Sequence, residues 1–263
     1  MKLAIAGKGG VGKTTLAGIL ARLLAKDGYK VIAIDADPAM NLSSVLGVDQ
    51  ETASKIIPIS ENYDLIEERT GARPGSSGSV FSLTPSVHDI AEKYGVPGPD
   101  NVKLIVMGTV KSGGSGCMCP ANSLLRTLLR HILINRKDAV IMDMEAGLEH
   151  LGRGTVKGVD AILSVVEPRM QSIETANRIL KLAHDIGVNS IFAVGNKVRN
   201  EEEKNFLDNM LNKMKVPMIG NIPYDEAISK SDMLRISPID FAPNSQAIKA
   251  INAIKEILIK YYT

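Results

Sequence analysis

Apolar residues recur along the chain in short uninterrupted runs, and these runs predict the strands of a sheet. Runs of strand length that are rich in β-branched residues and do not alternate with polar residues are typical of strands buried on both faces. Seven such runs occur, at 2–6, 30–34, 102–107, 139–142, 161–166, 190–194 and 216–220. The pattern therefore predicts a buried central sheet of about seven or eight strands.

Helical patterns separate these runs. Apolar residues repeat at spacings of three and four over 14–26, 122–134, 172–186, 201–214 and 244–261. Alternating strands and helices favour right-handed crossovers, and these give a mostly parallel sheet with helices on both faces. The predicted fold class is α/β, and the 263 residues are expected to form a single domain, 1–263, because no linker-like stretch divides them.

The segment 48–101 departs from this regular pattern. It holds weak helical patterns at 50–69 and 86–94, on either side of a Gly/Ser/Pro-rich stretch at 71–80. We expect a variable insertion here, with a surface loop at 71–80. Whether it has a role beyond adding length is open at this point.

Composition and charge restrict the class of protein. Hydrophobic residues make up 44% and charged residues 23% of the chain, which is typical of a globular domain. A net charge of only +2 gives no reason to expect a nucleic-acid partner. The first apolar run is broken at Gly7, and no apolar stretch is long enough to span a membrane, so we expect a cytoplasmic protein without a membrane partner.

Residues 7–14 read GKGGVGKT and fit the phosphate-binding pattern G-x-x-x-x-G-K-[ST], between a predicted strand and a predicted helix. In such a loop the backbone N–H groups surround phosphate oxygens, and the positive end of the helix assists them. The lysine, Lys13, contacts the β- and γ-phosphates, and the Thr14 hydroxyl binds Mg²⁺. The predicted nucleotide-binding residues of this loop are Gly9, Gly10, Val11, Gly12, Lys13, Thr14 and Thr15.

Aspartates follow two of the predicted strands. Asp143 ends the run 139–142, where its carboxylate is expected to bind Mg²⁺ together with Thr14, directly or through water. Asp37 follows the run 30–34 and could accept a proton from a water molecule that attacks the γ-phosphate. A plain Asp-Pro turn is the alternative interpretation of Asp37.

The residues after the run 190–194 bear on the choice of base. Asn196-Lys197 begins like the guanine-reading motif N-K-x-D, but Arg199 stands in place of the aspartate. A guanidinium has no acceptor for the guanine N–H groups, whereas the amide of Asn196 can both donate to adenine and accept from it. ATP is therefore favoured over GTP, and a turn-capping role for Asn196 is compatible with the same position.

The sequence K-G-G-V-G-K-T-T at 8–15 resembles the deviant P-loop of the superfamily of nitrogenase iron protein, septum-site and plasmid-partition ATPases. The resemblance implies a P-loop NTPase fold and a face-to-face homodimer in which Lys8 reaches the partner's nucleotide. D-A-D-P-A-M-N at 35–41 resembles the first switch of that family, which makes Asp37 the residue that orients or deprotonates water. Asn41 stands where several relatives carry a second aspartate, so that part of the switch differs here.

The resemblance extends to two further places in the chain. D-M-E-A-G at 143–147 is similar to the second switch, which implies that Gly147 senses the γ-phosphate through its N–H. Ile222-Pro223 resembles the second base-contacting loop, where Pro223 completes the adenine site. His150 follows the second switch, and its role is open.

Cys117 and Cys119 are the two cysteines of the chain, and their C-x-C spacing allows a chance pair, a redox pair, an iron–sulfur site or another metal site. A closed tetrahedral site needs four ligands, and one chain supplies two thiolates. Two chains that meet across a two-fold axis would supply four. We therefore favour a metal site between subunits, with unligated cysteines as the alternative.

G-G-S-G-C-M-C-P, followed by a helix and D-M-E-A-G-L-E-H-L-G-R-G-T, resembles the accessory ATPases that mature the nickel sites of carbon monoxide dehydrogenase and acetyl-CoA synthase. This resemblance covers nearly the whole chain. It implies an ATP hydrolase that uses ATP and Mg²⁺, binds Ni²⁺ (or Zn²⁺ in its place) through Cys117 and Cys119, and serves a client nickel enzyme.

Two other functions within the superfamily compete with this interpretation. An electron donor like the nitrogenase iron protein would hold a [4Fe–4S] cluster, but that family places its cysteines on two loops, and here both lie on one. A positioning ATPase would bind membrane or DNA, and the apolar stripe of the helix 244–261 is its best candidate feature. We expect that stripe to pack on the sheet instead.

Overall fold

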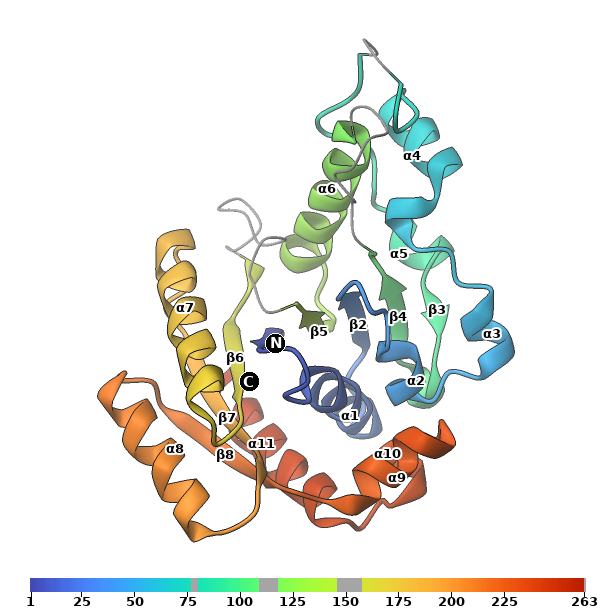
Figure 1. Cartoon of the computed structure of the whole chain (residues 1–263). Coiled ribbons are helices and arrows are strands. Elements are labelled where there is room, and N and C mark those ends of the chain that lie inside the picture. The colour runs from blue at the N-terminus through green and yellow to red at the C-terminus, as the bar shows by residue number, and fades with distance from the viewer. Residues whose placement is uncertain (77–79, 109–117, 146–157, 263) are drawn as a thin grey trace.

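A computed structural model describes residues 1–76, 80–108, 118–145 and 158–262. Its centre is an eight-stranded sheet with the strand order β3-β4-β2-β5-β1-β6-β7-β8 (Figure 1). The strands are β1 (Lys2–Gly7), β2 (Val31–Ala36), β3 (Val96–Pro97), β4 (Lys103–Val106), β5 (Ala139–Met144), β6 (Ala161–Val166), β7 (Ile191–Val198) and β8 (Met218–Pro223). Every pair is parallel except β3 with β4, so the predicted mostly parallel α/β sheet is confirmed.

Eleven α-helices lie in the described part of the chain. They are α1 (Lys13–Lys26), α2 (Leu42–Leu46), α3 (Gln50–Ser54), α4 (Tyr63–Thr70), α5 (Ile90–Lys93), α6 (Cys119–Asn135), α7 (Met170–Ile186), α8 (Glu201–Lys213), α9 (Glu226–Leu234), α10 (Pro238–Phe241) and α11 (Gln246–Tyr262). The short helices α2, α9 and α10 were not predicted. The predicted strand 216–220 was placed too early, because the strand at that point runs from Met218 to Pro223.

Helices cover both faces of the sheet, because successive strand residues point to opposite sides. On β1, Ala4 and Ala6 belong to a core that includes residues of α4, α6, α7 and α8. Leu3 and Ile5 belong to a second core, which includes residues of α1, α2 and α11. Figure 1 shows these two groups of helices on opposite sides of the strands.

The apolar stripe of α11 packs on the sheet, as expected. Ile248, Ile251, Ile254 and Leu258 are buried in the second core, whereas Ile257 and Tyr261 are exposed. In the part of the chain that the structure describes, no helix is both long and apolar enough to cross a membrane.

The segment 48–101 contributes to the core and to the sheet. Leu65 and Ile66 of α4 are buried in the same core as residues of α6, and β3 extends the sheet at its edge. The stretch after α4 also bonds to both helices: the N–H of Ser82 donates to the Thr70 carbonyl at 2.7 Å, and Ser123 Oγ donates to the Ser82 carbonyl at 2.9 Å. Residues 77–79 of the predicted surface loop lie outside the described ranges.

The parallel arrangement brings the carboxyl ends of the central strands to one edge of the sheet. In the register of the sheet, Asp143 of β5 is opposite Ile5 of β1 on one side and Asp35 of β2 on the other. The loop that follows β1 leaves the sheet beside these two aspartates. In open parallel sheets this edge is where ligands bind.

Candidate nucleotide site

The loop between β1 and α1 curls through two glycines that adopt left-handed backbone conformations. Gly10 has φ 80° and Gly12 has φ 93°, a region that side chains disfavour. Gly12 also has no room for a side chain, because a Cβ there would lie 2.3 Å from Asn196 Nδ2. α1 begins at the next residue, Lys13, so its free N–H groups face the loop as the phosphate-binding pattern predicts.

Two residues at the end of β7 hold this loop from the side. Asn196 is buried and donates from Nδ2 to the Val11 carbonyl at 2.6 Å. Lys197 donates from Nζ to the Gly10 carbonyl at 2.6 Å and to Glu167 Oε1 at 2.7 Å. The position of the loop therefore depends on β7, which is 185 residues away in sequence.

Asn196 was predicted as a base-contacting residue, and it lies next to the loop. Its Oδ1 accepts from the backbone N–H of Lys197 at 2.9 Å, while its Nδ2 holds Val11. One N–H and one lone pair of the amide are left for another partner. The amide thus fixes the phosphate-binding loop from a position that also borders the neighbouring pocket.

Lys8 extends from the loop toward α7 and donates from Nζ to Gln171 Oε1 at 2.7 Å. Gln171 lies in the first turn of α7 and is exposed. Nothing in the sequence pattern indicated Gln171 as part of the site, because it belongs to no motif. The contact gives Lys8 a partner within its own chain.

Lys13 is directed toward Asp37 across the site. The side chain of Lys13 is only 6% exposed, and its Nζ lies 3.8 Å from Asp37 Oδ2. Asp37 is fixed by its own turn, because its Oδ1 accepts from the N–H of Ala39 at 2.9 Å and its N–H donates to Asp35 at 3.2 Å. The structure therefore brings the predicted phosphate-binding lysine and the predicted water-orienting carboxylate together.

Asp35 and Asp143 are fully buried carboxylates at the same edge. Burial raises the pKa of Asp35 to about 6, although the N–H groups of Leu42 and Asp37 act in the opposite direction. Burial raises the pKa of Asp143 to about 7, with a smaller contribution in the same direction from Asp35. Asp35 binds the N–H of Leu42 at 3.0 Å and so holds the start of α2.

The surroundings of Asp143 fit a magnesium ion. Neither of its carboxylate oxygens has a hydrogen-bond partner among the described residues, although both are buried. Thr14 and Lys13 both lie near enough to lower the pKa of this carboxyl group. Buried acceptors without partners are costly, and a hard cation next to the Thr14 hydroxyl would satisfy them.

A cavity of about 650 Å³ lies over the loop. Its floor consists of the loop glycines and the first residues of α1, and its walls come from the segment after β2 and from α9. Asp37 and Asn41 line the first wall, and Ser229 and Asp232 line the second. The cavity lies directly over the N-terminus of α1, where phosphate groups bind favourably.

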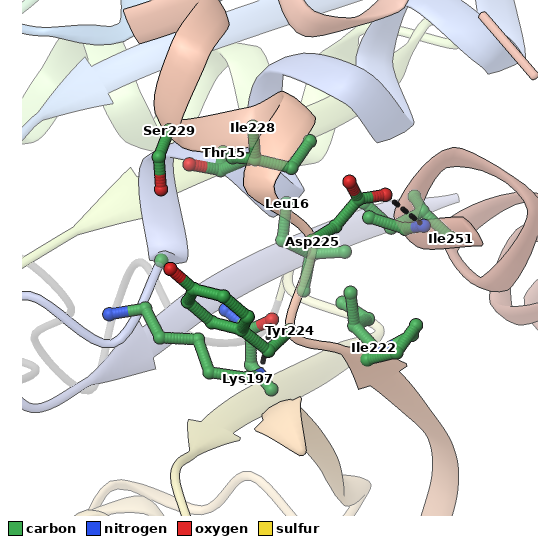
Figure 2. A pocket seen from close by; sticks show the side chains of 13 residues that line it. Thr15, Leu16, Lys197, Ile222, Tyr224, Asp225, Ile228, Ser229 and Ile251 are labelled. Atoms are coloured by element: carbon green, nitrogen blue, oxygen red, sulfur yellow. Dashed lines mark hydrogen bonds between the residues drawn. The ribbon is translucent and has the colours of Figure 1, made fainter. Parts of the chain in front are cut away.

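A second, smaller pocket of about 60 Å³ adjoins this cavity and shares Gly12 and Thr15 with it. Leu16, Ile222 and Ile251 form its apolar side, and Tyr224 and Lys197 lie on the other side (Figure 2). The predicted residues Asn196 and Pro223 both line it. An apolar pocket with a few polar groups beside a phosphate site is suited to a nucleotide base.

In the described lining of this pocket the carboxylate is that of Asp225. Asp225 lines the pocket, but its oxygens accept from the N–H groups of Ala227 at 2.9 Å and Ala247 at 3.0 Å. The guanidinium of Arg199 lies 5.0 Å from the centre of the Tyr224 ring. Arg199 Nη1 also lies 3.5 Å from Glu203 Oε1, so position 199 holds a cation in contact with a carboxylate and an aromatic ring.

The cysteine motif is described only in part. Cys119 is the first residue of α6, and Pro120 lies in the first turn of this helix. Cys117, Gly147 and His150 lie outside the described residues. Within the residues that are described, no group of three or more Cys, His, Asp and Glu side chains is placed to hold a metal ion.

Residues 2–249 match the family model of the CobQ/CobB/MinD/ParA nucleotide-binding domain. The carbon monoxide dehydrogenase accessory protein CooC of Rhodospirillum rubrum is 46% identical over 243 residues, which cover 92% of this chain and 91% of that protein. An ATP-binding protein of Methanocaldococcus jannaschii is also 46% identical, over 99% of this chain and 98% of its own length.

Solved structures of septum-site proteins share the fold. MinD in the MinC:MinD complex of Aquifex aeolicus superposes with a TM-score of 0.71 at 24% identity and covers 98% of this chain and 95% of its own. MinD of Pyrococcus horikoshii, in complex with Mg-ADP, gives a TM-score of 0.68 at 20% identity, over 99% of this chain and 96% of its own.

Proposed function

The chain belongs to the CobQ/CobB/MinD/ParA family of nucleotide-binding proteins, and we propose that it is a homodimeric ATPase that helps to load nickel into carbon monoxide dehydrogenase or acetyl-CoA synthase. The observation that carries the accessory role is the 46% identity to CooC over 92% of the chain. The P-loop, the two aspartates after the strands and the apolar base pocket all lie at one edge of the sheet, and this geometry supports ATP as the substrate.

Each residue of the site has a proposed role in hydrolysis. Lys13 binds the β- and γ-phosphates, and Asp37 orients the attacking water and accepts its proton. Thr14 and Asp143 would hold Mg²⁺, which neutralises charge on the phosphates. The buried position of Asp143 and the absence of hydrogen-bond partners for its two oxygens among the described residues support this assignment.

The adenine base is assigned to the pocket between Asn196 and Pro223, where Tyr224 and Ile222 supply contact area. The family resemblance adds Gly147, as the sensor of the γ-phosphate, and Lys8, which acts on the nucleotide of the second subunit. ATP should therefore both bind to the monomer and bring two monomers together.

The nickel ion is the cargo in this proposal. Cys117 and Cys119 of each subunit together supply four thiolates, which suit a borderline ion such as Ni²⁺ or Zn²⁺. Because the complete site exists only in the dimer, metal binding should favour dimerisation by mass action.

Metal content and oligomeric state, measured together, test this function. The parent should bind one Ni²⁺ per dimer and become dimeric when loaded, and the double variant Cys117→Ser/Cys119→Ser should lose both properties while it still binds ATP. One tightly held ion per monomer, or unchanged nickel binding by the double variant, would overturn the metal assignment. Visible iron–sulfur absorbance after anaerobic purification would favour the electron-donor function instead.

A further inference from the structure

Lys8 rests on a neutral partner in its own chain. Its Nζ donates to Gln171 Oε1 at 2.7 Å, and among the described residues it forms no ion pair. Lys8 itself is half-buried, and Gln171 is exposed at the start of α7. The contact joins the phosphate-binding loop to a helix that is 163 residues away in the sequence.

Hydrogen bonds fix the first turn of α7, which carries Gln171. Ser172 is buried, and its Oγ accepts from the N–H of Glu167 at 3.0 Å. Thr175 Oγ1 donates to the carbonyl of Gln171 at 2.9 Å. The amide of Gln171 therefore extends from a fixed point of the backbone toward the loop.

The nearby carboxylate, Glu167, pairs with Lys197 and not with Lys8. Glu167 Oε1 accepts from Lys197 Nζ at 2.7 Å, and Glu167 Oε2 lies 3.7 Å from Arg169 Nε. Two cations thus already pair with Glu167. Lys197 is held by a full charge and supports the loop, whereas Lys8 is held only by an amide dipole.

This difference determines how easily each lysine can leave its partner. An exposed hydrogen bond to a neutral amide is weak in net terms and leaves the ammonium charge uncompensated. A phosphate oxygen offers a charge-assisted hydrogen bond, which is shorter and stronger. A lysine that rests on an amide can therefore transfer to an anionic group at little cost.

We propose that Gln171 is the resting partner of Lys8 in the monomer and that it releases the lysine to the nucleotide of a second copy of this chain. Gln171 is then a weak competitor for Lys8: it holds the ammonium in the monomer without neutralising its charge. This inference rests on the proposed role of Lys8 across the dimer.

Two substitutions at one position have opposite expected effects. Gln171→Glu creates an ion pair that competes with the partner's phosphate, so dimerisation with a non-hydrolysable ATP analogue should weaken. An exposed ion pair shifts an equilibrium by about two- to five-fold, and two lysines leave per dimer, which gives about four- to 25-fold in the dimerisation constant. Gln171→Ala removes the competing contact, so dimerisation should tighten.

The measurement is sedimentation equilibrium of the full chain with the analogue and Mg²⁺, at low and high salt. High salt should reduce the gap between Gln171→Glu and the parent, because screening weakens an exposed pair. Asn177→Asp adds the same charge further along α7, on an exposed residue, and should dimerise as the parent does. Binding of a fluorescent ATP analogue by the monomer shows that each variant is folded.

The outcomes separate this inference from the proposed function. If Lys8→Ala dimerises and hydrolyses ATP as the parent does, the role of Lys8 across the dimer is wrong. If Lys8→Ala fails but both Gln171 variants match the parent, or both change in the same direction, only the role of Gln171 is wrong. A weakened Gln171→Glu dimer that salt does not restore would also overturn it.

Discussion

Replacing Asp143 with asparagine should make the metal-free protein more stable at neutral pH. In the folded protein the buried carboxyl group has a pKa of about 7, against an ordinary value of 3.8. Between these two values the folded state holds a proton that the unfolded state has lost, so stability falls as pH rises. An asparagine at this position has no charge to lose, and this part of the pH dependence should disappear.

The size of the effect follows from the shift. From pH 5 to pH 7 the unfolded aspartate is ionised while the folded one remains mostly protonated, and one bound proton over two pH units corresponds to about 3 kcal/mol. Between pH 5 and pH 8 the free energy of unfolding of the parent should therefore fall by about 3 kcal/mol more than that of Asp143→Asn. Asp35, with a pKa of about 6, adds a smaller loss of unfolding free energy over this pH range in both proteins.

Urea unfolding followed by circular dichroism, with a chelator and without nucleotide, measures this difference. Asp185→Asn, on α7 and remote from the site, should keep the pH dependence of the parent. Adding Mg²⁺ and ATP should stabilise the parent and have less effect on Asp143→Asn. Equal pH dependence in the parent and Asp143→Asn would refute the argument that burial of Asp143 is uncompensated without metal.

Three further substitutions test the loop and its supports. Gly12→Ala should reduce ATP affinity at least about tenfold in a fluorescence titration, because its Cβ would meet Asn196. Gly28→Ala is the control: Gly28 has the same φ of 93° but open space around it, so this variant should bind ATP normally. Asn196→Leu should also weaken ATP binding without any gain in GTP binding. Gly18→Val should lower turnover more than ATP affinity, because a Cβ there lies 2.6 Å from Val45 and displaces α2; steady-state kinetics separate the two effects.

Much of the fold could be predicted, because its signals are local. β1, which leads into the P-loop, and α1, which starts at Lys13, could be predicted from apolar runs and one motif. β3 was not readable, since two residues cannot show a period. α9 was missed as well, because it buries only Ser231 completely and so lacks an apolar face.

The supports of the site could not be predicted, for a different reason. Gln171 and Lys197 act through single hydrogen bonds to a loop more than 160 residues away. A lone polar residue has no periodicity and no motif, so one sequence gives no signal for it. Lys197 was noted only as the neighbour of Asn196, and neither its left-handed backbone at φ 57° nor its bond to Gly10 has a signal in the sequence.

Asn196 links the two halves of the candidate site. Its sequence position suggested base recognition, and in the structure its amide nitrogen also holds the loop at Val11. A ligand that hydrogen-bonds to the remaining N–H or lone pair of this amide therefore contacts the same side chain that holds the loop in place. Occupation of the base pocket and the geometry of the phosphate loop are therefore expected to be coupled through one side chain, which explains why Gly12 must leave room for it.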